Sequence, residues 1–184
     1  MSEAIAVTEF EEYLAAEGAS DLRHEYVGGR VYSMAGGSER HDLAAGLLYE
    51  AVAPAARAQG CRAFTANRLV RTGSGGGYYP DVVVVCGPAA HRMYEQGPSL
   101  VIEVLSPSTA DTDRREKALA YDASPALEQY LLVDPDARRI EMATPTREGG
   151  FSWESYGPGG VVLTRYASIE VDALYDQLDA VATT

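Results

Sequence analysis

The stretch LVIEVLSPSTADTDRREK, from Leu100 to Lys117, places a carboxylate inside an apolar run and ends on the only lysine of the chain. If the apolar part forms a strand, Val101 and Leu105 lie on the same face as Glu103, and apolar residues occupy the other face as well. We therefore predict a buried strand. An unpaired carboxylate buried there would cost several kcal/mol, on the order of the net stability of a domain. Glu103 therefore needs a cation.

A second carboxylate, Asp81, opens the preceding apolar run YPDVVVVCG. If the two runs pair as antiparallel neighbours, Asp81 and Glu103 converge at one end of the sheet. Two carboxylates suit Mg²⁺ or Mn²⁺ with water molecules completing the shell, and we expect mutual repulsion to raise their pKa. The alternative is that Asp81 only marks a strand start after Pro80, while Glu103 pairs with an arginine.

Lys117 belongs to a predicted helix, DTDRREKALAYDAS, which has aspartates at its start as the helix dipole favours. Lysine and arginine are not interchangeable where a compact ammonium is needed. If the helix folds back over the strand end, the Lys117 ammonium reaches the same site, and we expect its replacement to affect activity far more than stability. The alternative is a solvated lysine that pairs with Asp113, four residues earlier.

The rest of the chain alternates helical and strand patterns. A capping box at Thr8 and a stop at Gly18 predict a helix over Thr8–Glu17, and Gly28-Gly29 predicts a hairpin. Ser38 caps a long amphipathic helix that Pro54 should kink or end. Further strands are predicted at Cys61–Arg71 and Glu128–Pro135, followed by a β-meander over Arg138–Thr144, Gly149–Gly157 and Gly160–Ala167 and by a terminal helix over Ser168–Ala180.

This order predicts an α+β fold with a mixed central β-sheet flanked by helices, an extra N-terminal helix and hairpin, and a C-terminal β-meander. A chain of 184 residues is long enough for a single domain, and we place its core at about residues 38–134.

The composition constrains the expected location of the protein and the class of its substrate. No run of about eighteen apolar residues predicts a membrane helix, and the acidic N-terminus is not a secretory signal. Cys61 and Cys86 fit no metal-ligand spacing, so we expect reduced cysteines in a cytoplasmic protein. A net charge of −12 is unfavourable for nucleic-acid binding, which depends on phosphate contacts.

Several motifs in order resemble the Uma-two family of restriction endonucleases, within the PD-(D/E)XK nuclease superfamily. They are YPD, VIEVLSPST, DRREKALAY and YLLVDP, after the entry HEYVGGRVYSMAGGSERH, and the likeness runs from about Glu25 to Asp134. The resemblance implies a restriction-endonuclease-like core.

The resemblance also implies roles for single residues. Asp81 and Glu103 would be metal ligands, with the backbone carbonyl of Val104 as a third. Leu105 stands where the superfamily has lysine, and Lys117 would supply the ammonium from the next helix. Glu25 and His41 match further family positions, although His41 is also explained as an ordinary helix-surface residue.

We therefore predict a Mg²⁺- or Mn²⁺-dependent endonuclease acting on DNA, not bound to a membrane and forming a homodimer. Two alternatives stay open. One is an inactive nuclease-fold protein that works by binding. The other is a metal-dependent hydrolase of a small phosphorylated substrate.

Overall fold

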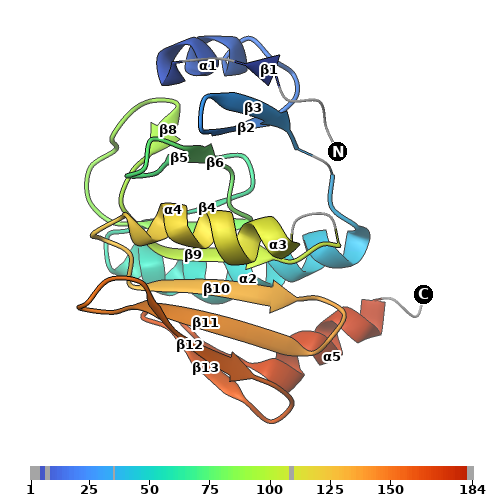
Figure 1. Cartoon of the computed structure of the whole chain (residues 1–184). Helices are drawn as coiled ribbons and strands as arrows, with labels where there is room; N and C mark the ends of the chain where they lie inside the picture. Colours follow the sequence, from blue (N-terminus) through green and yellow to red (C-terminus); the bar gives the residue numbers. More distant parts are fainter. Residues whose placement is uncertain (1–4, 7–8, 35, 108–109, 182–184) are drawn as a thin grey trace.

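A six-stranded mixed sheet forms the centre of the structure, a computed structural model that describes residues 5–6, 9–34, 36–107 and 110–181 (Figure 1). All neighbouring strands are antiparallel except β9 and β10, which are parallel. The predicted mixed sheet is therefore confirmed. In spatial order its strands are β12 (Phe151–Tyr156), β11 (Arg139–Pro145), β10 (Gln129–Asp134), β9 (Pro98–Val104), β7 (Val82–Val85) and β4 (Arg62–Thr65).

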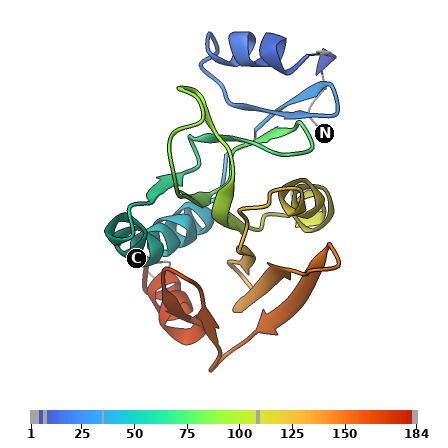
Figure 2. The ribbon, with the colours of Figure 1, turned by 90° about the vertical axis from the view of Figure 1, so that its left-hand side faces the viewer.

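Helices cover both faces of this sheet (Figure 2). On one face lie α2 (Glu39–Ala58) and α5 (Val171–Val181), which pack Leu48, Val52 and Leu174 into one hydrophobic cluster with Val82 and Ile102. On the other face lies the helical segment after β9, which belongs to a second cluster. Burial on both faces explains why β7 is apolar along its whole length and why β9 is apolar except at Ser99 and Glu103.

A second six-stranded sheet lies on the N-terminal side and is larger than the predicted hairpin (Figure 1). The hairpin itself is confirmed, but strands from the middle of the chain join it, and α1 (Phe10–Glu17) contributes to its hydrophobic cluster. In spatial order the strands are β1 (Ile5–Ala6), β3 (Arg30–Ser33), β2 (His24–Val27), β6 (Gly77–Tyr78), β5 (Leu69–Arg71) and β8 (Tyr94–Glu95).

Two strand predictions need correction because pairing partners decided them. The single strand expected over Cys61–Arg71 is divided: its first part, β4, joins the central sheet and its last part, β5, joins the N-terminal sheet. The meander ends at β12, since β13 (Val161–Leu163) pairs instead with β14 (Ser168–Glu170), the first residues of the expected terminal helix.

Helix boundaries follow the local signals in part. Ser38 caps α2, and its side chain accepts a hydrogen bond from the His41 backbone N–H. Gly18 ends α1 as predicted. The predicted capping residue Thr8 lies outside the described residues. Pro54 does not end α2, which continues to Ala58. The helix expected after β9 comprises α3 (Ala110–Thr112), a π-helical turn η1 (Asp113–Lys117) and α4 (Ala118–Asp122).

Cys61 and Cys86 form a disulfide, so the expectation of two reduced cysteines is wrong. The reason is the pairing of β4 with β7, which sets Arg62 opposite Val85 and the flanking cysteines opposite each other. In the described part of the chain, no helix combines the length and the apolar character that a bilayer crossing requires. The homodimer and the cytoplasmic location stay predictions.

Candidate active site

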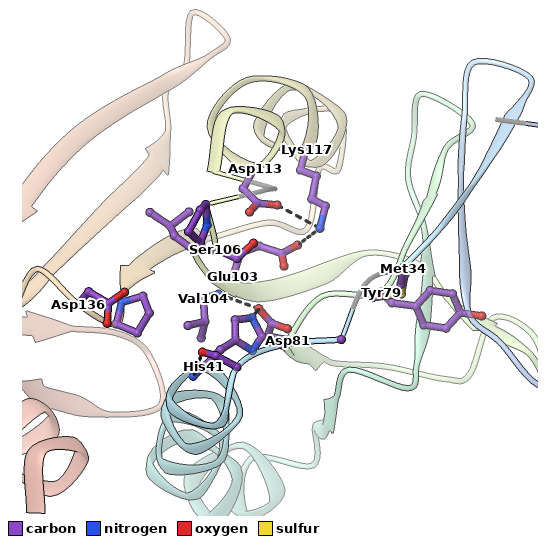
Figure 3. A pocket seen from close by; sticks show the side chains of 16 residues that line it. Met34, His41, Tyr79, Asp81, Glu103, Val104, Ser106, Asp113, Lys117 and Asp136 are labelled. Carbon is purple, nitrogen blue, oxygen red and sulfur yellow. Dashed lines mark hydrogen bonds and ion pairs between the residues drawn. The ribbon is translucent and has the colours of Figure 1, made fainter. Parts of the chain in front are cut away.

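The antiparallel pairing of β7 with β9 brings the two predicted carboxylates to one end of the central sheet. Val82 lies opposite Ile102, so Asp81 and Glu103 are the next positions on the two strands, as the sequence predicted. Asp81 is fixed by its Oδ2 atom, which accepts a hydrogen bond of 2.7 Å from the Val104 backbone N–H. Figure 3 shows both carboxylates facing one cavity.

Lys117 points its ammonium into this site from η1 (Figure 3). Its Nζ atom lies 3.3 Å from Glu103 Oε1, 3.2 Å from Glu25 Oε1 and 3.1 Å from Asp113 Oδ1. The side chain is only 7% exposed. The alternative of a solvated lysine is therefore wrong, although the pairing with Asp113 that it included is present. The cation beside Glu103 is Lys117. From this burial we now expect removal of Lys117 to lower stability as well, because it would leave buried carboxylates without their cation.

The protonation states in this cluster follow from burial and charge. Burial raises the pKa of Glu103 well above its ordinary value, and Asp113, Asp81 and Glu25 add to this rise while Lys117 opposes it. Burial also opposes the charge on Lys117, but the neighbouring carboxylates, Glu103 foremost, hold its pKa well above the ordinary value. The expected rise through mutual repulsion is thus present at Glu103, but burial is its main cause.

His41, at the start of α2, also contacts Asp81. Its Nε2 atom lies 3.3 Å from Asp81 Oδ2, and its side chain is 14% exposed. The hydrogen bond to Asp81 raises the pKa of His41 to about 9, against the opposing effect of burial. Asp42 adds a further interaction in the same direction, so we expect His41 to carry a positive charge at neutral pH. The alternative of an ordinary surface histidine is therefore wrong.

The structure thus brings all five predicted side chains together, with Val104 in the cavity wall and Glu25 touching the site through Lys117. The cavity has a volume of about 260 Å³. Its walls also include residues that were not predicted as part of the site: Tyr79, Ser106, Asp113 and Asp136. The spacing of Asp113, four residues before Lys117, was a signal for one of them, whereas Asp136 lies on a turn that only the fold brings near.

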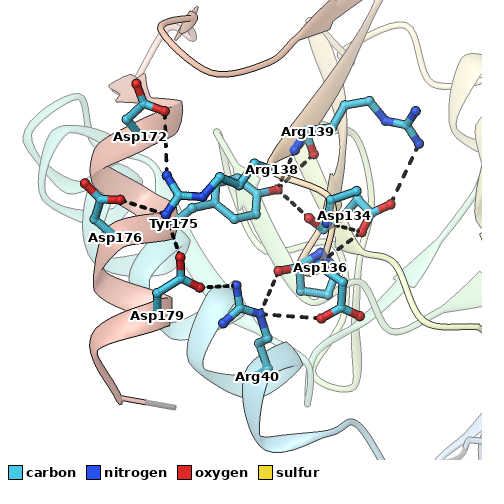
Figure 4. Close-up of polar contacts among 11 residues, drawn as sticks. Arg40, Asp134, Asp136, Arg138, Arg139, Asp172, Tyr175, Asp176 and Asp179 are labelled. Atoms are coloured by element: carbon cyan, nitrogen blue, oxygen red, sulfur yellow. Dashed lines mark hydrogen bonds and ion pairs between the residues drawn. The ribbon is translucent and has the colours of Figure 1, made fainter. Parts of the chain in front are cut away.

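The turn carrying Pro135 and Asp136 is held in place by α2 and α5 (Figure 4). Arg40, next to His41, donates a hydrogen bond of 2.7 Å to the Pro135 carbonyl and another of 2.7 Å to Asp179 on α5. The single proton of the Tyr175 hydroxyl is shared between the Asp134 and Arg139 carbonyls at the two ends of the same turn, and the Arg139 backbone N–H donates to this hydroxyl. Hydrogen bonds from α2 and α5 therefore connect this wall of the cavity to the two helices.

The donor atoms suit a partly hydrated hard cation. Within the described ranges, no three histidine, cysteine, aspartate or glutamate side chains form a ready-made metal cage. Mg²⁺ does not require one, because proteins usually hold it through one or two carboxylates and leave waters on the ion. The oxygens Glu103 Oε1 and Asp113 Oδ1 are buried and accept no hydrogen bond from the described residues, so their only cationic partner is Lys117. Asp81 and Glu103 therefore fit such an ion, and Val104 lies in the wall of the same cavity.

The chain is similar in sequence to a known family and to two relatives. Residues 10–174 match the model of the Uma2 family, described as "Putative restriction endonuclease". An uncharacterized protein of Synechocystis sp. is 32% identical over 142 residues, covering 76% of this chain and 75% of the relative. A second one from the same organism is 30% identical over 135 residues, covering 71% and 76%.

A solved structure has a similar fold. It is a protein of Anabaena variabilis, described as a "putative nuclease belonging to DUF820", and it superimposes with a TM-score of 0.71 at 18% identity. The match covers 86% of this chain and 93% of the other. The predicted restriction-endonuclease-like α+β fold is confirmed.

Proposed function

This chain belongs to the Uma2 family, and on that basis we propose that it is a nuclease that hydrolyses phosphodiester bonds in DNA with Mg²⁺ or Mn²⁺. The observation that carries the proposal is the convergence of Asp81, Glu103 and Lys117 on one cavity. Two carboxylates and an ammonium at one point are the groups that metal-assisted phosphoryl hydrolysis requires.

Each residue has a role in this proposal. Asp81 and Glu103 would hold the cation, with the Val104 carbonyl as a third oxygen. When bound, the ion supplies a water of lowered pKa and neutralises charge that develops on the phosphate. Lys117 orients that water or stabilises the phosphate in the transition state. Its counter-charges keep it protonated and directed into the cavity.

His41 orients Asp81 in this scheme. The Val104 N–H and the His41 ring both contact Asp81 Oδ2, so the other carboxylate oxygen is left to face the cavity. An imidazolium at this position also adds positive charge near the place where a phosphate would lie.

Metal binding and hydrolysis are tested separately. Titration calorimetry with Mn²⁺ should show binding by the wild type and none by Asp81→Ala or Glu103→Ala. Plasmid DNA, single-stranded DNA and RNA are then incubated with Mg²⁺, Mn²⁺ or EDTA, with Glu103→Ala as the control. We expect metal-dependent cleavage of DNA that the variant lacks. Equal Mn²⁺ binding by all three proteins, or cleavage that persists in EDTA, would remove the proposed site.

A second candidate function is hydrolysis of a small phosphorylated substrate. The charge of the cavity favours it, because four carboxylates, Asp81, Glu103, Asp113 and Asp136, outnumber the two cations His41 and Lys117 among its lining residues, which is unfavourable for a polyanion. The two functions differ in the bond that is broken. A nuclease hydrolyses the diester bis(p-nitrophenyl) phosphate faster than the monoester p-nitrophenyl phosphate, whereas a phosphatase shows the opposite preference.

A further inference from the structure

A second hollow adjoins the cavity on the side of the N-terminal sheet. It has a volume of about 560 Å³ and shares Met34, Gly36, Gly37, His41 and Asp81 with the cavity. Beyond these shared residues, the hollow extends to Arg23, before β2, and to Thr65 and Asn67, at the turn between β4 and β5. The two hollows therefore meet at His41 and Asp81, where a bound chain can pass from one to the other.

The excess of carboxylates along both hollows is less unfavourable for a single strand than for a DNA duplex, which carries twice the charge per unit length. Their lining residues include six carboxylates but only three cations, Arg23, His41 and Lys117. Most other arginines are already paired with carboxylates, as Arg62 and Arg68 are with Glu95. A duplex carries one negative charge per ~1.7 Å, and its affinity comes largely from many phosphate contacts. A chain with a net charge of −12 offers few of them.

The depth of the site also distinguishes single-stranded DNA from a duplex. The side chains of Asp81 and Glu103 are only 12% and 3% exposed. Elements on several sides surround them, including the start of α2, the turn of Pro135 and Asp136, and η1 (Figure 3). A cavity of about 260 Å³ has room for on the order of nine water molecules. A single strand can bend one phosphate into this space, whereas the stiff backbone of a duplex cannot.

We infer that the substrate is single-stranded DNA, and that the strand lies along the second hollow with one phosphate at Asp81 and Glu103. This inference rests on the proposed nuclease function and specifies its substrate. Arg23 is suited to contact the strand, because its side chain is 42% exposed and its closest carboxylate, Glu17, is 3.8 Å away. The exposed amide of Asn67 both donates and accepts hydrogen bonds, as base edges require.

The experiment measures binding without hydrolysis. Fluorescence anisotropy compares a labelled single-stranded oligonucleotide with the duplex of the same sequence, in Ca²⁺, which also takes oxygen ligands. We expect the single strand to bind at least tenfold more tightly. Arg23→Ala and Asn67→Ala should each weaken single-strand binding about fivefold to tenfold. The matched control is Arg147→Ala, which removes an exposed arginine of the β11–β12 turn, away from both hollows.

The outcomes separate this inference from the nuclease function. Equal or tighter duplex binding, no single-strand binding, or an equal loss in Arg147→Ala overturns the inference, even if metal-dependent DNA cleavage is observed. Selective single-strand binding that depends on Arg23 and Asn67 supports it. If such binding occurs but no DNA is cleaved with Mg²⁺ or Mn²⁺, the inference about the bound strand holds and the proposed hydrolysis fails.

Discussion

Replacing Lys117 by methionine removes one ammonium from the centre of three carboxylates while nearly preserving the volume of the side chain. In the wild type, Glu25, Glu103 and Asp113 each lie between 3.1 and 3.3 Å from Lys117 Nζ. In the variant, no other lysine or arginine is paired with Glu103 among the described residues. The buried carboxylates must then lose charge or remain uncompensated.

The size of the effect follows from the cost of protonating Glu103. Protonating a carboxyl of ordinary pKa, about 4.3, at pH 7 costs about 3.7 kcal/mol, because each pH unit corresponds to about 1.4 kcal/mol. Breaking a buried ion pair by removal of one partner typically costs about 3–5 kcal/mol. We therefore expect Lys117→Met to lower the free energy of unfolding by about 3 kcal/mol at pH 7.

The loss should depend on pH in a definite direction. Burial raises the folded-state pKa of Glu103 above its unfolded value already in the wild type, and in the variant this pKa rises further because the opposing ammonium is gone. The stability that neutral Glu103 contributes is then fully present below the unfolded pKa and is lost as the pH rises towards the folded pKa. Because Lys117 keeps the pKa of Glu103 lower in the wild type than in the variant, the difference in stability between them should be larger at pH 7 than at pH 5.

Urea denaturation followed by circular dichroism, in EDTA at pH 5 and pH 7, measures this difference. Arg115→Met is the matched control, since it removes an exposed cation from the same helical turn and should change stability by less than about 0.5 kcal/mol. Adding Glu103→Gln to Lys117→Met should restore stability, because the uncompensated charge is then gone. A Lys117→Met variant as stable as the wild type, or a double variant less stable than the single one, would refute the reasoning.

Two further predictions concern the supports of the site. Gly37→Ala should cost about 1–3 kcal/mol and displace His41, because a Cβ there would lie 2.5 Å from His41 Nδ1, whereas at Gly36 it meets nothing within 4 Å. Thermal unfolding and the His41 ring signals in NMR spectra should change in Gly37→Ala and not in the control Gly36→Ala. Cys61→Ser should cost about 3 kcal/mol by opening the loop closed with Cys86, and a reductant should destabilise the wild type by a similar amount. A wild-type denaturation midpoint that is unchanged by reductant would contradict the role of the disulfide.

Activity provides an independent test of Lys117. Lys117→Arg should lower DNA cleavage by about 10²-fold, the size typical of losing one transition-state stabiliser, because a planar guanidinium cannot replace a compact ammonium between three carboxylates. Full activity of Lys117→Arg would show that only a positive charge is needed there and would remove the specific role of the lysine.

Much of the site was predictable because its residues conflict with their local surroundings. Glu103 is a charge in an apolar run, and Lys117 is the only lysine in a chain of fourteen arginines. A charge that local structure cannot stabilise must have a partner elsewhere, so each of these residues indicates a site even without coordinates. The alternation and the turn residues likewise indicated most helices and strands, including the hairpin at Gly28-Gly29.

Partners distant in the sequence were not predictable in the same way. Asp113 looked like half of a surface pair, and only the packing of η1 over β9 makes it a buried counter-charge of Lys117. Asp136 and Arg40 belong to the cavity wall and its support because the β10–β11 turn lies beside the start of α2. No local pattern encodes that contact.

The sequence by itself indicated that Glu103 and Lys117 carry charge into the core, and it predicted the class of fold and the antiparallel approach of Asp81 and Glu103. These follow from side-chain period and from the cost of burying charge, which act within a few residues. The tertiary structure alone decided that residues 61–71 divide between two sheets, that Cys61 meets Cys86, and that the carboxylates lie at the bottom of a cavity. These features depend on which strands pair and which helices cover them. The free energy that favours this arrangement over others comes from the whole core and not from any one segment.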